Sequence, residues 1–157
     1  MIFEKLDLLK FEIDKLKKLN KKIVWTNWCF DIIHPWHIQT FKDSKKLWDV
    51  LVVWINSDSS PYFKSKPWRP INNQQFRSEM IDCIRYVDFV YLFDDETPIV
   101  SISSLLPDIL VKWWDYNVEE IVWYKEVTEN WWKVLTIPIF WSYSTTAVIK
   151  KILDVYW

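Results

Sequence analysis

Two histidines, His34 and His37, are the residues of this chain best suited to chemistry, and the chain has no others. They lie three residues apart around Pro35, shortly after an apolar stretch that begins at Ile23. A helix that begins at Pro35 would direct free backbone N–H groups and a partial positive charge at a ligand beyond that stretch. His37, in the first turn, would reach the same anion as His34. The spacing predicts a phosphate site, whereas isolated histidines are more often structural.

Hydroxyl groups near the C-terminus could complete such a site. Residues 142–146 read SYSTT and precede a predicted helix, so Ser144, Thr145 and Thr146 would present hydroxyl and N–H groups to an anion. The alternative is that they only cap the helix, which is the common role of serine and threonine there. Beside a second helix N-terminus that carries histidines, they would form a phosphate clamp.

A group of basic residues falls in residues 56–70, a segment without hydrophobic periodicity. It contains Lys64, Lys66 and Arg69 together with three prolines. A connection of that length in a compact domain is more often functional than idle, and we interpret it as a mobile basic loop. The alternative is an ordinary solvated connection, because lysine side chains usually lie in solvent.

The composition limits the partners of the chain. Its 20 basic and 21 acidic residues leave a net charge of −1, which predicts no broad electrostatic field for nucleic acid or membrane. The sequence has neither the unbroken apolar segment of a secretory signal nor one that could span a bilayer, so we expect a cytoplasmic protein. Cys29 and Cys83 lack metal-binding spacing and are expected to be reduced, with Cys29 in a packing or backbone role.

The hydrophobic pattern predicts one α/β domain over residues 1–157, with an amphipathic helix in residues 1–20 packed on its outside. Strand-like and helical stretches alternate five times, which predicts a Rossmann-like, doubly wound, five-stranded parallel sheet. The predicted strands are residues 23–26, 49–55, 87–92, 108–111 and 134–137. The predicted helices are residues 3–19, 35–47, 72–84, 97–105, 118–130 and 145–155.

Polar residues follow several of the predicted strands. Thr26 and Asn27 end the first strand, while Lys112 and Asp115 follow the fourth. In doubly wound sheets the ligand binds outside the carboxyl ends of the strands, where the winding reverses. One crevice at this edge could therefore gather these residues with the histidines and the C-terminal hydroxyl groups.

The chain contains no glycine but 13 tryptophans. Average usage predicts roughly eleven glycines in a chain of this length. Trp48 follows a predicted helix and residues 131–132 lie between a helix and a strand, which are places where a left-handed residue normally ends the helix. We therefore hypothesise that tryptophan stands in for glycine. The alternative is a tryptophan-rich protein whose indoles stack on sugars or bases.

Several motifs, occurring in order, resemble those of a known family. With glycine in place of Trp28 and Trp36, residues 26–37 (TNWCFDIIHPWH) resemble the TNGCFD and HxGH signatures of the nucleotidyltransferase superfamily. RPIN, LVKWWDY and YSTT resemble further motifs of the adenylyltransferase domain of bacterial ADP-heptose synthases, and the resemblance runs over residues 23–152. Ten tryptophans fall where that family carries, or often carries, glycine: Trp28, Trp36, Trp48, Trp54, Trp68, Trp113, Trp114, Trp123, Trp131 and Trp132.

The resemblance implies transfer of AMP from ATP to D-glycero-β-D-manno-heptose 1-phosphate, with release of pyrophosphate and with Mg²⁺ bridging the phosphates. It implies four catalytic residues, without deciding between the two lysines: His34, His37, Lys64 and Lys66. The implied nucleotide-binding residues are Thr26, Asn27, Trp28, Cys29, Phe30, Lys112, Asp115, Ser144, Thr145 and Thr146. The implied substrate-binding residues are Asp31, Arg69 and Arg77.

Two other functions stay open at this point. The HxGH signature does not fix the base, so the chain could be a cytidylyltransferase that acts on glycerol phosphate or a similar alcohol phosphate. Literal indoles at Trp28 and Trp36 would block the phosphate loop and leave a catalytically impaired binding protein.

The expected partners are small molecules, ATP and a sugar 1-phosphate, rather than nucleic acid or a membrane. A homo-oligomer is possible, and no protein-bound metal site is expected beyond the phosphate-bridging Mg²⁺.

Overall fold

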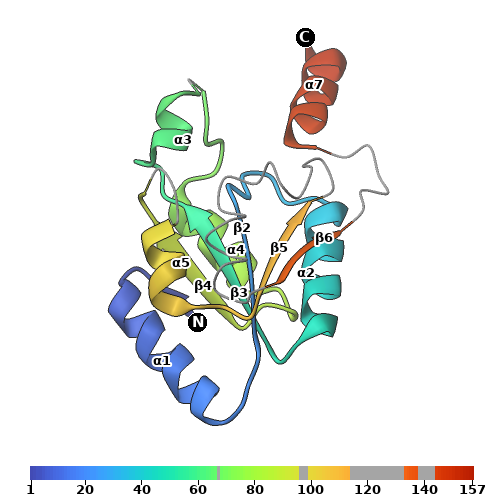
Figure 1. Ribbon diagram of the computed structural model, residues 1–157. Helices are drawn as coiled ribbons and strands as arrows, with labels where there is room; N and C mark the ends of the chain where they lie inside the picture. Colours follow the sequence, from blue (N-terminus) through green and yellow to red (C-terminus); the bar gives the residue numbers. More distant parts are fainter. Residues whose placement is uncertain (67, 96–98, 114–132, 138–143) are drawn as a thin grey trace.

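A parallel sheet forms the centre of the molecule, and the described part of the chain contributes six strands to it (Figure 1). The computed structural model describes residues 1–66, 68–95, 99–113, 133–137 and 144–157. The strands are β1 (Ile2–Phe3), β2 (Ile23–Trp28), β3 (Val50–Asn56), β4 (Phe89–Phe93), β5 (Ile109–Trp113) and β6 (Lys133–Ile137). Their order is β1-β4-β3-β2-β5-β6, so the winding reverses at β2 and β5.

The doubly wound parallel sheet expected from the sequence is confirmed, with one strand more than predicted. All five predicted strands are present, and β1 adds a sixth by pairing with β4 through Ile2↔Val90 and Phe3↔Tyr91. The hydrophobic pattern assigns Phe3 to the N-terminal helix, but that helix begins only at Leu6. A strand of two residues is too short to show an alternating pattern, which is why the sequence did not reveal it.

The helices pack on both faces of the sheet or lie beyond its carboxyl edge (Figure 1). They are α1 (Leu6–Lys18), α2 (Pro35–Leu47), α3 (Pro61–Lys64), α4 (Gln74–Asp82), α5 (Ile99–Leu105) and α7 (Thr145–Tyr156). The predicted bounds of α2 match, whereas α4 is capped by Asn73, whose side chain accepts from the Phe76 N–H, and not by Asn72. The helix predicted at residues 118–130 lies outside the described residues. Within the described ranges, no helix combines the length and apolar character needed to cross a bilayer.

Alternate residues of the strands point into two separate apolar cores. On one face, Trp25 of β2 and Trp54 of β3 pack with Leu9 of α1 and Ile102 of α5. On the other face, the neighbouring strand residues pack with Phe41 of α2 and Ile81 of α4. This burial on both faces explains why the strands read as nearly continuous apolar runs. The carboxyl ends of β2 and β3 are thereby held on a rigid base.

Tryptophan side chains fill part of the first core. The rings of Trp25 and Trp54 meet edge to face at 4.6 Å between centroids, and Trp54 also contacts Tyr91 at 5.1 Å. The Trp54 Nε1 is buried and has no hydrogen-bond partner in the described part of the chain. An unpaired buried N–H group costs free energy, so this indole is not an ideal occupant of its position.

Backbone angles support the stand-in hypothesis at a single tryptophan. Trp68 has φ of 76° and a side chain that is 91% exposed, a conformation that glycine adopts without cost. The expected left-handed conformation of Trp48 is wrong, because its φ is −155° and the chain continues from α2 in an extended form. No other tryptophan with described backbone has positive φ.

The stand-in hypothesis makes a prediction about mass. The printed sequence corresponds to 19.3 kDa, and each exchange of tryptophan for glycine removes an indole side chain. We expect the protein purified from its natural source to have a lower intact mass, by a whole number of such exchanges. Intact-mass spectrometry followed by peptide mapping measures this directly. A mass that agrees with the printed sequence would exclude the hypothesis.

Candidate active site

The N-terminus of α2 holds both histidines. His34 is the N-cap residue, with extended backbone angles, Pro35 occupies the first turn and His37 follows two residues later. The His34 backbone N–H donates a hydrogen bond to His37 Nδ1 at 3.3 Å, and the imidazole rings stack with centroids 3.7 Å apart. The predicted pairing of the two imidazoles at a helix N-terminus is therefore present in the structure.

The hydrogen bond between the two histidines fixes the tautomer of one of them. Because His37 Nδ1 accepts from a backbone N–H, the neutral ring carries its proton on Nε2. His34 Nδ1 is buried and has no hydrogen-bond partner among the described residues. Buried polar atoms are normally paired, so this nitrogen is a candidate contact for a ligand.

Burial keeps both imidazoles neutral near pH 7. Burial, with a smaller contribution from the neighbouring His34, lowers the pKa of His37 to about 3. Burial also lowers the pKa of His34. Neutral rings can donate N–H groups to a phosphate without adding charge, so positive charge at this edge must come from the α2 dipole and from basic side chains.

Aromatic side chains of the loop between β2 and α2 and of the first turn of α2 pack against the histidines. Phe30 has φ of 47°, a left-handed conformation that costs roughly 1–2 kcal/mol for a residue with a Cβ atom. This turn places the fully buried Phe30 ring edge to face with His37, at 5.1 Å between centroids, and against Phe41. Trp36 lies beside both imidazoles, 6.1 Å from His34 and 6.3 Å from His37 between centroids. Phe30 thus contacts a catalytic candidate with its side chain.

The other residues expected at this loop lie mostly inside the protein. Thr26 and Asn27 are buried at the end of β2, and Trp28 is partly buried against the second core. Cys29 is buried, and its thiol lies 3.8 Å from the Tyr62 hydroxyl. The packing and backbone role expected for Cys29 agrees with this placement.

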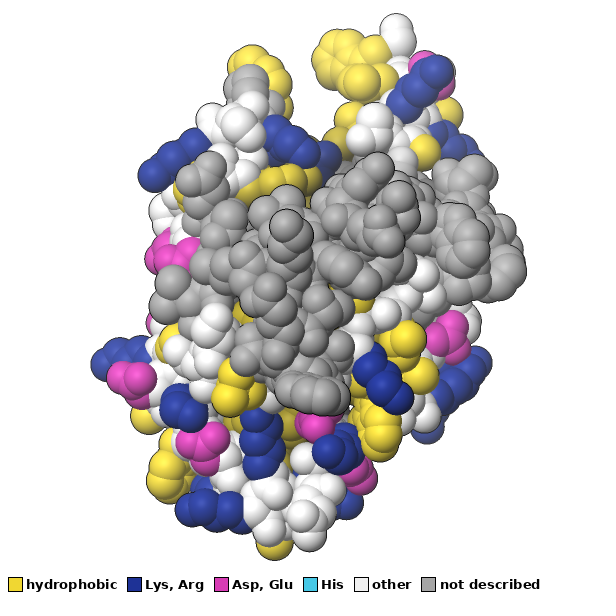
Figure 2. Space-filling view, viewed as in Figure 1, with side chains coloured by type: hydrophobic (Ala, Val, Ile, Leu, Met, Phe, Trp, Pro, Cys, Tyr) yellow, Lys and Arg dark blue, Asp and Glu magenta, His cyan; other side chains and the backbone are white. Residues whose placement is uncertain are grey.

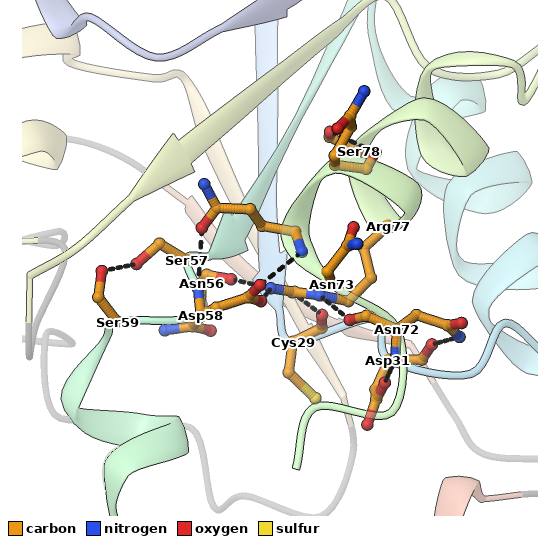
Figure 3. Close-up of polar contacts among 12 residues, drawn as sticks. Cys29, Asp31, Asn56, Ser57, Asp58, Ser59, Asn72, Asn73, Arg77 and Ser78 are labelled. Carbon is orange, nitrogen blue, oxygen red and sulfur yellow. Dashed lines mark hydrogen bonds and ion pairs between the residues drawn. The ribbon is translucent and has the colours of Figure 1, made fainter.

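Asp31 anchors the loop that carries the RPIN motif. Its buried carboxylate accepts from Arg69 Nε at 2.5 Å and from the backbone N–H groups of Ile71 and Asn72 at 2.8 and 2.9 Å. The Asn72 side chain in turn donates to the Asp31 carbonyl at 2.6 Å (Figure 3). Only the Nε of Arg69 has a partner in the described part of the chain, so its two Nη groups are available to an anion.

Arg77 joins the ends of two strands. Its fully buried guanidinium donates to the carbonyls of Cys29 and Asn56 at 2.6 and 2.7 Å and pairs with Asp58 at 2.7 Å (Figure 3). A further bond from Nε reaches the Asn72 carbonyl at 3.0 Å. All three nitrogens of the guanidinium are therefore occupied by the protein. Arg77, expected to bind substrate, instead holds the segments that carry the other candidate residues.

The basic loop includes α3 and stands at the carboxyl edge of the sheet (Figure 1). Figure 2 shows a hollow at this edge, between the α3 and α7 regions, with Lys or Arg side chains on the α3 side. Lys64 and Lys66 are exposed. Lys66 Nζ donates to the Tyr62 hydroxyl at 2.7 Å, while Lys64 has no hydrogen bond in the described part of the chain.

The C-terminal hydroxyl groups lie at the start of α7. Ser144 is the N-cap residue, and its Oγ accepts from the Ala147 N–H at 3.0 Å, as expected of an ordinary cap. Thr145 and Thr146 occupy the first turn. The side chain of Lys112 and all of Asp115 lie outside what the structure describes, so their expected roles stay predictions.

Sequence reasoning missed three polar residues that organise this edge. Asp58 pairs with Arg77, Tyr62 contacts both Cys29 and Lys66, and Asp94 accepts hydrogen bonds from Ser57 and Ser59. Asp94 directly follows β4, and Asp58 comes two residues after the end of β3, so their position after buried strands was a usable signal. Tyr62 gave none, because its contacts depend on how the basic loop folds back. Among the described residues, no cluster of three or more His, Cys, Asp or Glu could hold a metal ion.

Comparisons with known proteins agree with this arrangement. The sequence model of the family described as cytidylyltransferase-like matches residues 25–151. The bifunctional protein HldE of Hyphomonas neptunium is 38% identical over 146 residues, which make up 93% of this chain and 30% of that protein. The chain thus spans about 30% of the length of the curated relatives it matches.

Two solved structures share the fold. A lipopolysaccharide core biosynthesis protein from Thermoplasma volcanium GSS1 has a TM-score of 0.63 and 27% identity, over 79% of this chain and 99% of that one. Pantoate-beta-alanine ligase from Francisella tularensis has a TM-score of 0.66 and 15% identity, over 98% of this chain and 78% of that one. The second similarity is one of fold alone.

The low pKa of His37 predicts that the protein loses stability in mild acid. Between the folded pKa of about 3 and the ordinary value of 6.5, the unfolded chain binds more protons than the folded one. The stabilisation is complete above pH 6.5 and is lost as pH falls, by about 2 kcal/mol at pH 5. Urea unfolding between pH 8 and pH 5 measures the slope.

The matched variant for this test is His37→Gln, whose amide oxygen can still accept from the His34 N–H. We expect a flatter dependence of unfolding free energy on pH, with the remainder contributed by His34, the only other histidine. An unchanged slope would mean that His37 is not held neutral by burial.

Proposed function

This chain belongs to the cytidylyltransferase-like family, and from that premise we propose that it transfers AMP from ATP to D-glycero-β-D-manno-heptose 1-phosphate. The observation that carries the proposal is the pair of stacked, neutral imidazoles at the N-terminus of α2. The similarity to bifunctional HldE proteins over most of this chain supports ATP and a heptose phosphate as the substrates. The similarity to the lipopolysaccharide core biosynthesis protein from Thermoplasma volcanium agrees with that choice.

The reaction needs charge stabilisation more than proton transfer. A phosphate oxygen of the sugar 1-phosphate attacks the α-phosphorus of ATP, the bond to the bridging oxygen of the β-phosphate breaks, and pyrophosphate leaves. Because the nucleophile is already an anion, no general base is required. The His34 and His37 N–H groups and the N-terminus of α2 would donate hydrogen bonds to α- and β-phosphate oxygens as charge develops.

The basic loop would supply the positive charge that the neutral histidines lack. The Nη groups of Arg69 are available, while Asp31 holds the Nε and so orients the guanidinium. An oriented arginine suits a phosphate, because its paired N–H groups match two oxygens. We assign Arg69 to the sugar phosphate and a lysine of the basic loop to the phosphates of ATP. The first turn of α7 would contact the β- and γ-phosphates.

Magnesium would be bound mainly through the phosphates. The described carboxylates nearest the loop are already engaged, since Asp31 binds Arg69 and Asp58 binds Arg77 and the Gln74 N–H. Mg²⁺ retains several waters and is commonly held by few protein ligands together with substrate phosphates. When bound, it would neutralise charge on the triphosphate. We expect this reaction to take place in the cytoplasm.

A cytidylyltransferase acting on an alcohol phosphate is the second candidate, and the description of the matching family favours it. Pyrophosphate release from ATP, CTP, GTP and UTP, each with heptose 1-phosphate or glycerol 3-phosphate, separates the two functions. We expect release only with ATP and the heptose phosphate. Release with CTP and glycerol phosphate would establish the second candidate, and the absence of binding to any nucleotide would favour a non-catalytic protein.

Replacing either histidine should remove most of the activity. We expect His34→Asn and His37→Asn to lower kcat/KM by about 100-fold or more, the usual effect of losing one transition-state hydrogen-bond donor. Circular dichroism and thermal unfolding check that the variants are folded. Cys83→Ser, which alters an exposed residue at the end of α4, serves as the control. Activity within threefold of the parent in both histidine variants would contradict the proposal.

Replacing Trp36 with glycine should increase the activity. The indole lies beside both imidazoles, in the space that a nucleotide phosphate would use, and the resembled motif has glycine there. We expect Trp36→Gly to lower the KM for ATP severalfold, at a cost in stability of about 3–5 kcal/mol for the lost buried ring. Trp48→Gly makes the same exchange at the opposite end of α2 and should leave the KM unchanged. A folded Trp36→Gly variant with weaker ATP binding would contradict this view.

A further inference from the structure

The two lysines of the basic loop have different neighbours. Lys66 Nζ donates to the Tyr62 hydroxyl at 2.7 Å and lies 4.0 Å from the centroid of the Tyr62 ring. The hydrogen bonds from Ser57 and Ser59 lower the pKa of Asp94, and the charge of Lys64 adds only a small contribution. Lys66 is thus held by Tyr62, whereas Lys64 has no such contact among the described residues.

Tyr62 connects Lys66 to the loop between β2 and α2. The Cys29 thiol lies 3.8 Å from the Tyr62 hydroxyl, and Cys29 is the second residue after Asn27 in the loop that leads to His34. The Cys29 carbonyl is fixed by Arg77 at 2.6 Å. Tyr62 therefore connects the Lys66 ammonium to the segment that positions the histidines.

The base beneath Tyr62 is rigid. The next residue, Phe63, is buried, and its ring lies under the Arg77 guanidinium, 4.9 Å from the guanidinium carbon to the ring centroid. Arg77 thereby holds both ends of the contact, through the Cys29 carbonyl and through Phe63. An exposed lysine beside a rigid tyrosine loses less conformational freedom when it binds a ligand than a lysine without a partner.

We propose that Tyr62 is a positioning residue that holds Lys66 over the nucleotide loop, and that Lys66, not Lys64, is the loop lysine that binds the phosphates of ATP. The hydrogen bond and the contact with the ring are each weak at an exposed site, so a phosphate can draw the ammonium away from the phenol. Lys64 contributes to the general positive charge of the loop. This inference rests on the proposed function for the identity of the ligand.

The first experiment compares four variants by pyrophosphate release and by titration with a non-hydrolysable ATP analogue. We expect Lys66→Gln to weaken ATP binding and lower kcat/KM by 10-fold or more, and Lys64→Gln to have less than a third of that effect. Tyr62→Phe keeps the ring and should raise the KM for ATP about two- to fivefold with little change in kcat. Tyr86→Phe removes a tyrosine hydroxyl outside the loop and should change neither value. Equal losses for the two lysine variants, or a larger loss for Lys64→Gln, would overturn the assignment.

A second experiment does not require activity or nucleotide. Reductive methylation of the intact protein, mapped by mass spectrometry, reports how accessible each ammonium is. Lys66 should react more slowly than Lys64 in the parent, and Tyr62→Phe, which removes the hydrogen bond but keeps the ring, should reduce the difference. Equal rates in the parent would show that Tyr62 does not hold Lys66. If the methylation pattern is found but no nucleotide binds, the proposed function fails while the contact between Tyr62 and Lys66 stands.

Discussion

The buried guanidinium of Arg77 is the contact on which the rest of the site depends. A charge removed from water must be paired and hydrogen-bonded, and here the partners are Asp58 and the carbonyls of Cys29, Asn56 and Asn72. These carbonyls belong to the ends of β2 and β3 and to the segment before α4. One side chain thus joins three pieces of chain that would otherwise end as separate loops at the edge of the sheet.

The position of the histidines follows from this contact. The Arg77 bond fixes the Cys29 carbonyl, and the next residue, Phe30, turns in a left-handed conformation with its ring under His37. Such a strained turn persists only where the surrounding contacts over-determine it, which the core around Phe41 provides. Asp31 then ties the same loop to the RPIN segment. The strain is stored at the place where a phosphate is expected to bind.

The site combines two neutral histidines with a positively charged loop. Burial lowers the pKa of both histidines and leaves them uncharged near pH 7. The two imidazoles can therefore donate directed hydrogen bonds, but they add no positive charge to the site. The charges of Lys64, Lys66 and Arg69 lie on a segment at the surface of the same edge. This division suits a reaction in which a triphosphate must first bind and pyrophosphate must later leave, because charge on a loop can be withdrawn.

The sequence by itself determined the parallel α/β fold, the helix that begins at Pro35 and the pairing of the two histidines, because these depend on local periodicity and on spacing along the chain. It did not reveal β1, whose two residues carry no pattern. Nor did it show that Arg77 donates its hydrogen bonds to backbone carbonyls or that Tyr62 contacts Lys66. Only the tertiary structure decided these points. A side chain's partners are set by which distant segments the fold brings together, and burial, which made the histidines neutral and took Arg77 from solvent, is a property of that packing and not of the residue.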